Sequence, residues 1–212
     1  LQNVALGGTA VGNGANTPKG YRKIAIIELG KISKLKLKPE PDMQFSLQSK
    51  LPVANVSAAL RNLVLEIGKI ANDIRLMASG PIAGLAELGI PAVHAGSSIM
   101  PGKVNPVIPE AVAMACADVI GNDVTVTLAG QSGNFQLNVM LPVVAYNLLK
   151  SINLLGNAMP LLANKSIKTF KINSKNINES LSKNPILVTA LNRIIGYSKA
   201  AAVAKKAYKE GK

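Results

Sequence analysis

The chain has 212 residues, of which 48% are hydrophobic and only 3% are aromatic, and it contains no Trp. This length suffices for one core with a small additional domain, and the aliphatic composition favours helices packed on helices over a β-sandwich. A single cysteine, Cys116, excludes an internal disulfide framework and fits a reducing compartment, so we expect a cytoplasmic protein.

The formal net charge of +13 includes two lysine clusters, at residues 31–38 and 199–212. Such clusters can attract nucleic acid, but aromatic platforms and an Arg-rich groove are missing, so we predict no nucleic-acid partner. A positive field could instead steer a small dianionic substrate. Glu110, Pro142, Asn147 and Lys150 interrupt the apolar runs before they reach the roughly 18 to 20 residues of a membrane helix, so no membrane partner is predicted.

The amino-terminal residues 1–14 are expected to end a helix, with small residues on closely packed faces. A dinucleotide-binding fingerprint is the alternative, but Gly12-x-Gly14-x-x-Thr17 lacks the third glycine and no strand precedes it. A short helix is predicted over residues 21–32. The alternating Lys and Leu residues that follow predict a loop or a brief extended piece ended by Pro39 and Pro41.

Three long helices are predicted next, over residues 51–77, 106–128 and 137–163. In the first, apolar residues recur at three- and four-residue steps, which is typical of an amphipathic helix. The third is apolar nearly all round, and such a helix is normally buried on every side. One small domain offers little burial of that kind, so we infer a bundle completed by other subunits.

The sequence beyond Ser166 becomes polar and Asn-rich, with short helical patterns at 176–182, 185–192 and 198–210. The last helix is predicted to be capped by Ser198 and stopped by Gly211. We therefore predict an all-α fold, with a long-helix bundle over residues 1–165 that includes a mobile loop at 95–106. A small helical carboxy-terminal domain is predicted over residues 166–212.

Residues 96–106, Gly-Ser-Ser-Ile-Met-Pro-Gly-Lys-Val-Asn-Pro, concentrate reactive side chains. Glycines at both ends of the central turn permit movement, whereas Pro101 and Pro106 stiffen their own positions. Asn105 followed by proline is a favourable start for the next helix. The loop should therefore deliver Lys103 and Asn105 to the amino end of that helix, where free N–H groups favour an anionic ligand.

The stretch "GSSIMPGKVNP" resembles the mobile-loop motif of the fumarase/aspartase superfamily, and most closely its class II fumarase form. Four further segments resemble fumarase in the family's order: "ALGGTAVGNGANT" at 5–17, "KIANDIRLMASGP" at 69–81, "LAGQSGNFQLNVMLP" at 128–142 and "LVTALNRIIGYSKAAAVAKKAYKEG" at 187–211. The resemblance implies an incomplete central helical domain followed by a truncated carboxy-terminal domain. It also implies a homotetramer whose active sites are shared between subunits.

The activity implied by this resemblance is the reversible hydration of fumarate to L-malate, a tricarboxylic acid cycle reaction. It proceeds by anti addition or elimination through a doubly charged aci-carboxylate, whose extra charge must be stabilised. Ser97 would be the catalytic base and Glu110 would orient a catalytic histidine from another subunit. The implied substrate-binding residues are Ser98, Lys103, Val104 and Asn105. No cofactor and no metal are expected.

Several features depart from the family pattern. The only histidine, His94, does not match the family's catalytic position, and Ile82 stands where relatives carry Arg. Two upstream active-site motifs have no counterpart, so the 212 residues alone are expected to be inactive and the complete parent chain to be the lyase. Aspartate ammonia-lyase of the same superfamily, an inactive fragment and a non-catalytic helical scaffold remain alternatives. A scaffold has no physical need for the loop's reactive set.

Overall fold

The computed structural model describes residues 2–211. Its contacts divide the chain into two units: Leu1–Asn72 with Ile108–Ala163, here called the bundle unit, and Asp73–Val107 with Asn164–Lys212, here called the loop unit. Each consists mainly of helices, which confirms the predicted all-α class. The predicted domain boundary between residues 165 and 166 remains a prediction.

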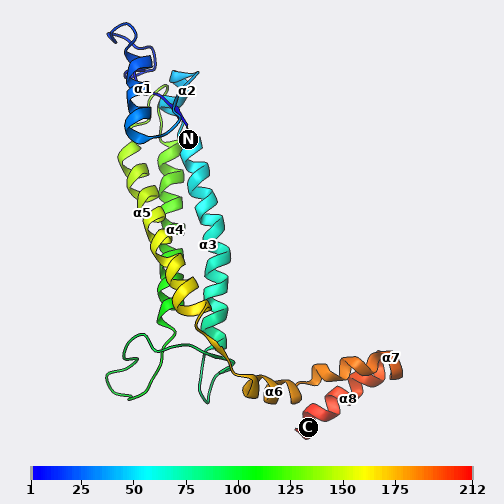
Figure 1. Cartoon of the computed structure of the whole chain (residues 1–212). Coiled ribbons are helices and arrows are strands. Elements are labelled where there is room, and N and C mark those ends of the chain that lie inside the picture. Colours follow the sequence, from blue (N-terminus) through cyan, green and yellow to red (C-terminus); the bar gives the residue numbers. More distant parts are fainter. Residues whose placement is uncertain (1, 212) are drawn as a thin grey trace. The chain divides into compact units, whose positions relative to one another are not determined.

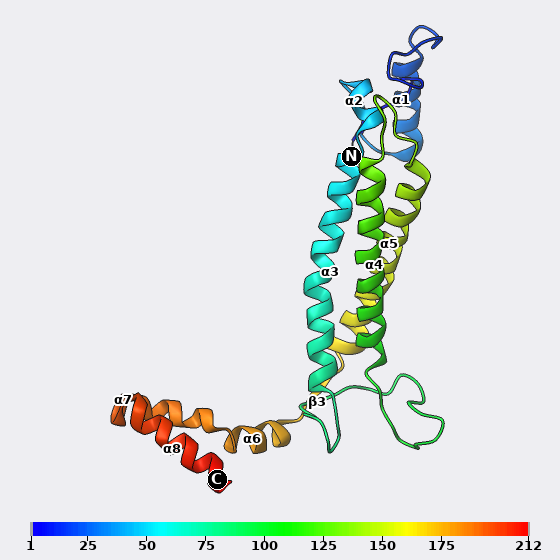
Figure 2. The same ribbon diagram turned by 180° about the vertical axis from the view of Figure 1, so that it is seen from behind.

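Three long helices make up most of the bundle unit: α3 (Leu51–Met77), α4 (Val107–Gln131) and α5 (Leu141–Leu162). They run side by side, with α4 between α3 and α5 (Figures 1 and 2). All three were predicted, but α5 begins four residues later than expected. The buried amide of Asn138 donates to the carbonyls of Ala129 and Gly130 and accepts from Met140 N–H, so residues 132–140 form a turn.

The apolar core lies where α4 meets its two neighbours. Val64 of α3, Val112 and Val126 of α4 and Val144 of α5 are all at most 2% exposed. Gly68 packs against Cys116, because a Cβ atom on this glycine would lie 3.6 Å from the Cys116 Cβ. Burial raises the pKa of the Cys116 thiol, as is usual for a cysteine packed in a core.

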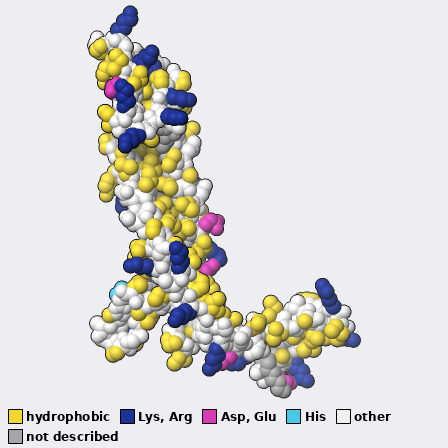
Figure 3. Space-filling model, viewed as in Figure 1, with side chains coloured by type: hydrophobic (Ala, Val, Ile, Leu, Met, Phe, Trp, Pro, Cys, Tyr) yellow, Lys and Arg dark blue, Asp and Glu magenta, His cyan; other side chains and the backbone are white. Residues whose placement is uncertain are grey.

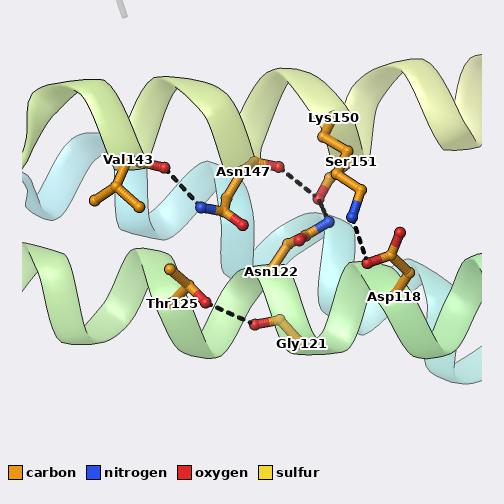
Figure 4. A network of polar contacts seen from close by, with 8 residues as sticks. All are labelled: Asp118, Gly121, Asn122, Thr125, Val143, Asn147, Lys150 and Ser151. Atoms are coloured by element: carbon orange, nitrogen blue, oxygen red, sulfur yellow. Dashed lines mark hydrogen bonds and ion pairs between the residues drawn. The ribbon is translucent and has the colours of Figure 1, made fainter.

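A polar layer crosses the α4–α5 contact (Figure 4). Asn122 Nδ2 donates to Ser151 Oγ at 3.1 Å, and this hydroxyl donates to the Asn147 carbonyl at 2.9 Å. Asn147 Nδ2 donates to the Val143 carbonyl. Because all three polar side chains are buried and bonded, the layer favours one axial register of α4 against α5.

Charged pairs flank this polar layer. Lys150 Nζ lies 2.8 Å from Asp118 Oδ1 between α5 and α4, and Arg61 Nε lies 3.0 Å from Asp123 Oδ2 between α3 and α4. α4 is the one described helix that is long and apolar enough to cross a membrane. Its place between two helices and its buried residues identify it as a core helix of the bundle.

Large apolar side chains remain exposed along the bundle (Figure 3). On α5 and α4 these residues are Leu141, Tyr146, Leu149, Ile152, Leu161, Met114, Val124 and Leu128. The predicted all-round apolar character of residues 137–163 is therefore only partly matched by burial within this chain. Contiguous exposed apolar surface of this kind is typical of a protein–protein contact.

The amino-terminal prediction was wrong. Residues 2–14, the described part of this segment, do not end a helix: β1 (Asn3–Val4) pairs in parallel with β2 (Lys38–Pro39), and turns occupy most of the segment between β1 and α1 (Tyr21–Ser33). Gly12 adopts a φ of 81° and packs so tightly on Gln44 that a Cβ atom would lie 2.6 Å from its backbone nitrogen. That close approach of an irregular segment to the first turn of a helix, rather than packing between two helices, accounts for this glycine.

Two short helices complete the amino-terminal part of the bundle unit. The predicted helix at 21–32 is confirmed as α1 (Tyr21–Ser33). The helix α2 (Met43–Gln48) was not predicted, because it is too short for a periodic apolar pattern. Its start is fixed by Asp42, whose side chain accepts from Phe45 N–H at 2.9 Å.

The loop unit holds the carboxy-terminal elements. β3 (Leu88–Gly89) pairs antiparallel with β4 (Lys171–Ile172), which follows η1, a single π-helical turn at Ala163–Ile167. The remaining elements are α6 (Ser174–Ser182), the 3-10 helix η2 (Pro185–Leu191), α7 (Asn192–Ile195) and α8 (Tyr197–Glu210). The helical patterns are confirmed, as is the left-handed Gly211 stop, but α8 begins after Gly196 and Ser198 is not its cap.

Candidate functional site

The reactive stretch lies in an irregular loop that leaves β3 after Gly89 and enters α4 at Val107 (Figures 1 and 2). Within this loop the backbone of Gly96 touches the backbone of Lys103, so closely that a Cβ atom on Gly96 would overlap the Lys103 carbonyl. Asn105 Nδ2 donates to the Gly96 carbonyl at 2.7 Å. These two contacts form a neck that joins the two ends of residues 96–105.

The chain inside the neck turns back at Gly102, which adopts a φ of 79°, a left-handed conformation that favours glycine. Lys103 N–H donates to the Met100 carbonyl at 3.3 Å across this turn. The segment from Ser97 to Gly102 is therefore an Ω-shaped loop with a closed base. The base depends on glycine at position 96 because only a residue without a side chain allows the backbone contact.

Ser97 is half-buried just inside the neck. Its Oγ accepts from two backbone N–H groups, those of Ile99 at 3.2 Å and Met100 at 3.1 Å. Donors aimed at an oxygen stabilise negative charge on it more than they stabilise the neutral hydroxyl. This geometry can therefore stabilise the alkoxide form of Ser97, the form in which a serine acts as a base.

The other predicted site residues differ in exposure. Ser98, Lys103 and Val104 are exposed on the loop, and Val104 retains 49% of its accessible surface. Glu110 lies in the first turn of α4 and is half-buried. The neck brings together Gly96, Lys103 and Asn105, while Ser97 and Ser98 follow directly on its inner side.

His94 lies outside the neck and is exposed, with its Nδ1 atom against the carbonyl of the next residue, Ala95. Among residues 2–211, no group of three or more His, Cys, Asp or Glu side chains is arranged to hold a metal ion.

Sequence reasoning missed the two N–H donors to Ser97. The signal for them was a serine followed by a loop, since serine hydroxyls commonly bond backbone groups two or three residues further on. Asn105 also differs from expectation. Its side-chain amide closes the neck by donating to the Gly96 carbonyl. Its backbone carbonyl accepts from Val107 N–H at 2.9 Å where α4 begins.

Two family models match the chain. The model described as Lyase matches residues 1–121, and the model described as Fumarase C C-terminus matches residues 187–212. Among curated proteins, "Fumarate hydratase class II 2" of Pseudomonas aeruginosa is 53% identical over 212 residues, which cover 100% of this chain and 46% of that protein. "Fumarate hydratase class II" of Xylella fastidiosa is 50% identical over 99% of this chain and 44% of its own length.

Solved structures agree with these matches. A class II fumarase from Schistosoma mansoni has a TM-score of 0.91 at 33% identity, covering 99% of this chain and 47% of that one. A structure described as fumarate lyase:delta crystallin from Brucella melitensis bound to cobalt has a TM-score of 0.89 at 44% identity, covering 100% of this chain and 46% of that one.

The chain thus spans about half the length of the relatives that it matches, and its match to the carboxy-terminal family model identifies the region as the C-terminal part of the subunit. The Lyase model covers more than half of the chain, and the similar curated proteins are class II fumarate hydratases. The chain belongs to the fumarase/aspartase superfamily of lyases, in its class II fumarase branch.

Proposed function

We propose that the full-length subunit catalyses the reversible hydration of fumarate to L-malate, and that this chain supplies the reactive loop. The observation that carries the proposal is the pair of N–H donors on Ser97 Oγ, which favours the alkoxide that can act as the base. The family membership and the class II fumarate hydratase relatives give the substrate pair.

In the malate-to-fumarate direction, Ser97 acts as its alkoxide, takes a proton from the carbon beside one carboxylate and becomes the neutral hydroxyl. The electron pair moves into that carboxylate, giving an aci-carboxylate with an additional negative charge. Lys103 supplies a cation for this charge and Asn105 supplies an oriented amide donor. Ser98 and Val104 line the same loop and contact the substrate.

The second half of the elimination expels the hydroxyl group from the opposite face, where an acid protonates it to water. Glu110 is proposed to orient a histidine from another subunit for this step. In the hydration direction the same groups act in reverse, so that water adds anti to the returning proton. No cofactor enters this scheme.

A homotetramer with shared active sites is part of the proposal. The exposed apolar residues of α4 and α5 support it, because a helix such as α5 is normally covered on every side. We place this enzyme in the cytoplasm and in the tricarboxylic acid cycle, with fumarate and L-malate as its small-molecule partners.

Product analysis of the full-length protein tests the proposal. The full-length protein is incubated with fumarate in water, with and without ammonium. The loss of fumarate is followed by its ultraviolet absorbance, and the products are then separated and identified. Malate formation independent of ammonium is the expected result. Aspartate formed only with ammonium would identify an ammonia-lyase, and unchanged fumarate in both samples would support a non-catalytic scaffold.

A further inference from the structure

The upstream end of the reactive loop is anchored at a junction formed by Ala86 and Glu87, just before β3. Every backbone polar group of these two residues is bonded. Ala86 N–H donates to the Ser79 carbonyl at 2.6 Å, and Glu87 N–H donates to the Met77 carbonyl at 2.8 Å. Both acceptors lie at the end of α3 or just beyond it.

The two carbonyls of the junction are bound by the beginning of α6. Asn173 Nδ2 and Asn176 Nδ2 donate to the Ala86 carbonyl at 3.0 and 3.2 Å, and Asn173 N–H donates to the Glu87 carbonyl at 2.8 Å. Immediately afterwards, β3 pairs with β4 through Leu88 and Gly89. All these groups belong to the loop unit, and Figure 2 labels β3 at this point.

Ala86 adopts a φ of 48°, a left-handed conformation that is unfavourable for a residue with a side chain. Such a conformation persists only where the surroundings fix it. The two asparagine amides and the Ser79 carbonyl are the groups that fix it here. The junction is half-buried, whereas most of the loop beyond it is exposed.

We infer that Asn173 and Asn176 are positioning residues for the reactive loop, because they hold the Ala86 carbonyl just before β3, the strand from which the loop departs. The inference rests on the proposed function. While the junction is held, the part of the chain that can move is limited to residues 90–106. When the junction's hydrogen bonds are weakened, the part that can move extends back toward Ser79. A longer free segment visits the closed neck less often, because closing a longer loop has a larger entropic cost.

The effect on kinetics follows from this population shift. Saturating substrate selects the ordered loop, so loosening the junction should raise KM while leaving kcat nearly unchanged. General misfolding would instead lower kcat in proportion to the inactive fraction and leave KM unchanged. The split between KM and kcat therefore separates positioning from a merely structural role.

The decisive variant is Asn173→Asp in the full-length subunit. The Asn173 side chain also caps α6 by accepting from Asn176 N–H, and aspartate caps helices as well as asparagine does. Its carboxylate, however, cannot donate to the Ala86 carbonyl. We expect KM for fumarate to rise about tenfold, consistent with one lost donor and one new repulsive contact. Asn178→Ala, an exposed asparagine on the same helix, is the matched control and should match the wild type.

Amide hydrogen exchange provides a readout independent of turnover. Asn173→Asp and Asn176→Ala should both accelerate exchange at Ile99 and Met100, whose N–H groups bond Ser97 Oγ, with α6 still protected. Wild-type KM and wild-type exchange in both variants would overturn the inference. If the wild-type protein did not hydrate fumarate but exchange still rose in these variants, the proposed function would fail while the anchoring role stood.

Discussion

The reactive loop and the α4–α5 polar layer contain the same residue types, serine and asparagine, in different surroundings. In the layer, Asn122 and Ser151 are 5% and 2% exposed and bond each other between two helices. In the loop, Ser97 and Asn105 are half-buried and bond only the backbone of their own turn. Buried asparagine and serine therefore stabilise the fold, whereas the same residue types on a short loop keep their polar atoms near solvent.

This comparison predicts that the loop can be broken without unfolding the bundle. Gly96→Ala should lower kcat/KM of the full-length protein by about 100-fold, because the new Cβ would overlap the Lys103 carbonyl and displace the loop's reactive groups. The free energy of unfolding, measured with urea, should stay near the wild-type value. Steady-state kinetics and denaturation on the same preparation check both parts.

Gly102→Ala is the matched control for this substitution. Nothing lies within 4 Å of a Cβ atom at position 102, so only the φ of 79° opposes alanine there. Its loss of activity should be clearly smaller. Equal losses in the two variants would show that conformational freedom, and not the neck contact, makes these glycines necessary.

The polar layer should show the reverse pattern. Asn122→Ala removes the donor to Ser151 Oγ inside the bundle, and we expect the free energy of unfolding to fall by about 1–2 kcal/mol. The KM for fumarate should not change. Thr125→Ala on the same helix removes only an exposed bond to the Gly121 carbonyl (Figure 4) and should have little effect.

The smallest effect is expected at the Lys150–Asp118 pair. The hydrogen bond to Asp118 raises the pKa of Lys150. The pair therefore contributes stability below the ordinary lysine pKa, and that contribution is lost as pH rises through the raised folded-state pKa. Lys150→Met and Asp118→Asn should each lower the thermal midpoint slightly at neutral pH. The difference from the wild type should vanish in alkali; a difference that persisted there would exclude an electrostatic origin.

The helices could be predicted because their apolar spacing is long and regular, as in residues 51–77, where the predicted and observed bounds coincide. The junctions could not. β1 with β2, and β3 with β4, join segments far apart in sequence through two-residue pairings that leave no periodic signal. The start of α5 also depended on one buried side chain, Asn138, whose amide shapes the preceding turn.

The candidate site likewise has features that the sequence predicts and features that it does not. Motif composition was enough to select Ser97, Lys103 and Asn105, because reactive residue types cluster in one short stretch. The donors to Ser97 are backbone groups of Ile99 and Met100, and a serine in a loop indicates bonds of this kind without fixing which N–H groups make them. The neck contact between Gly96 and Lys103 likewise depends on backbone path and became apparent only in three dimensions.

The central claim is that the reactive loop contributes to catalysis but little to the stability of the fold. Its most direct test is Ser97→Ala in the full-length protein, with fumarate hydration and thermal unfolding measured on one sample. Turnover should fall by roughly 100- to 10,000-fold, the range for loss of a general base, while the unfolding midpoint stays unchanged. Ser98→Ala should retain more activity. Wild-type turnover in Ser97→Ala, or a loss of turnover matched by a lower midpoint, would contradict the account.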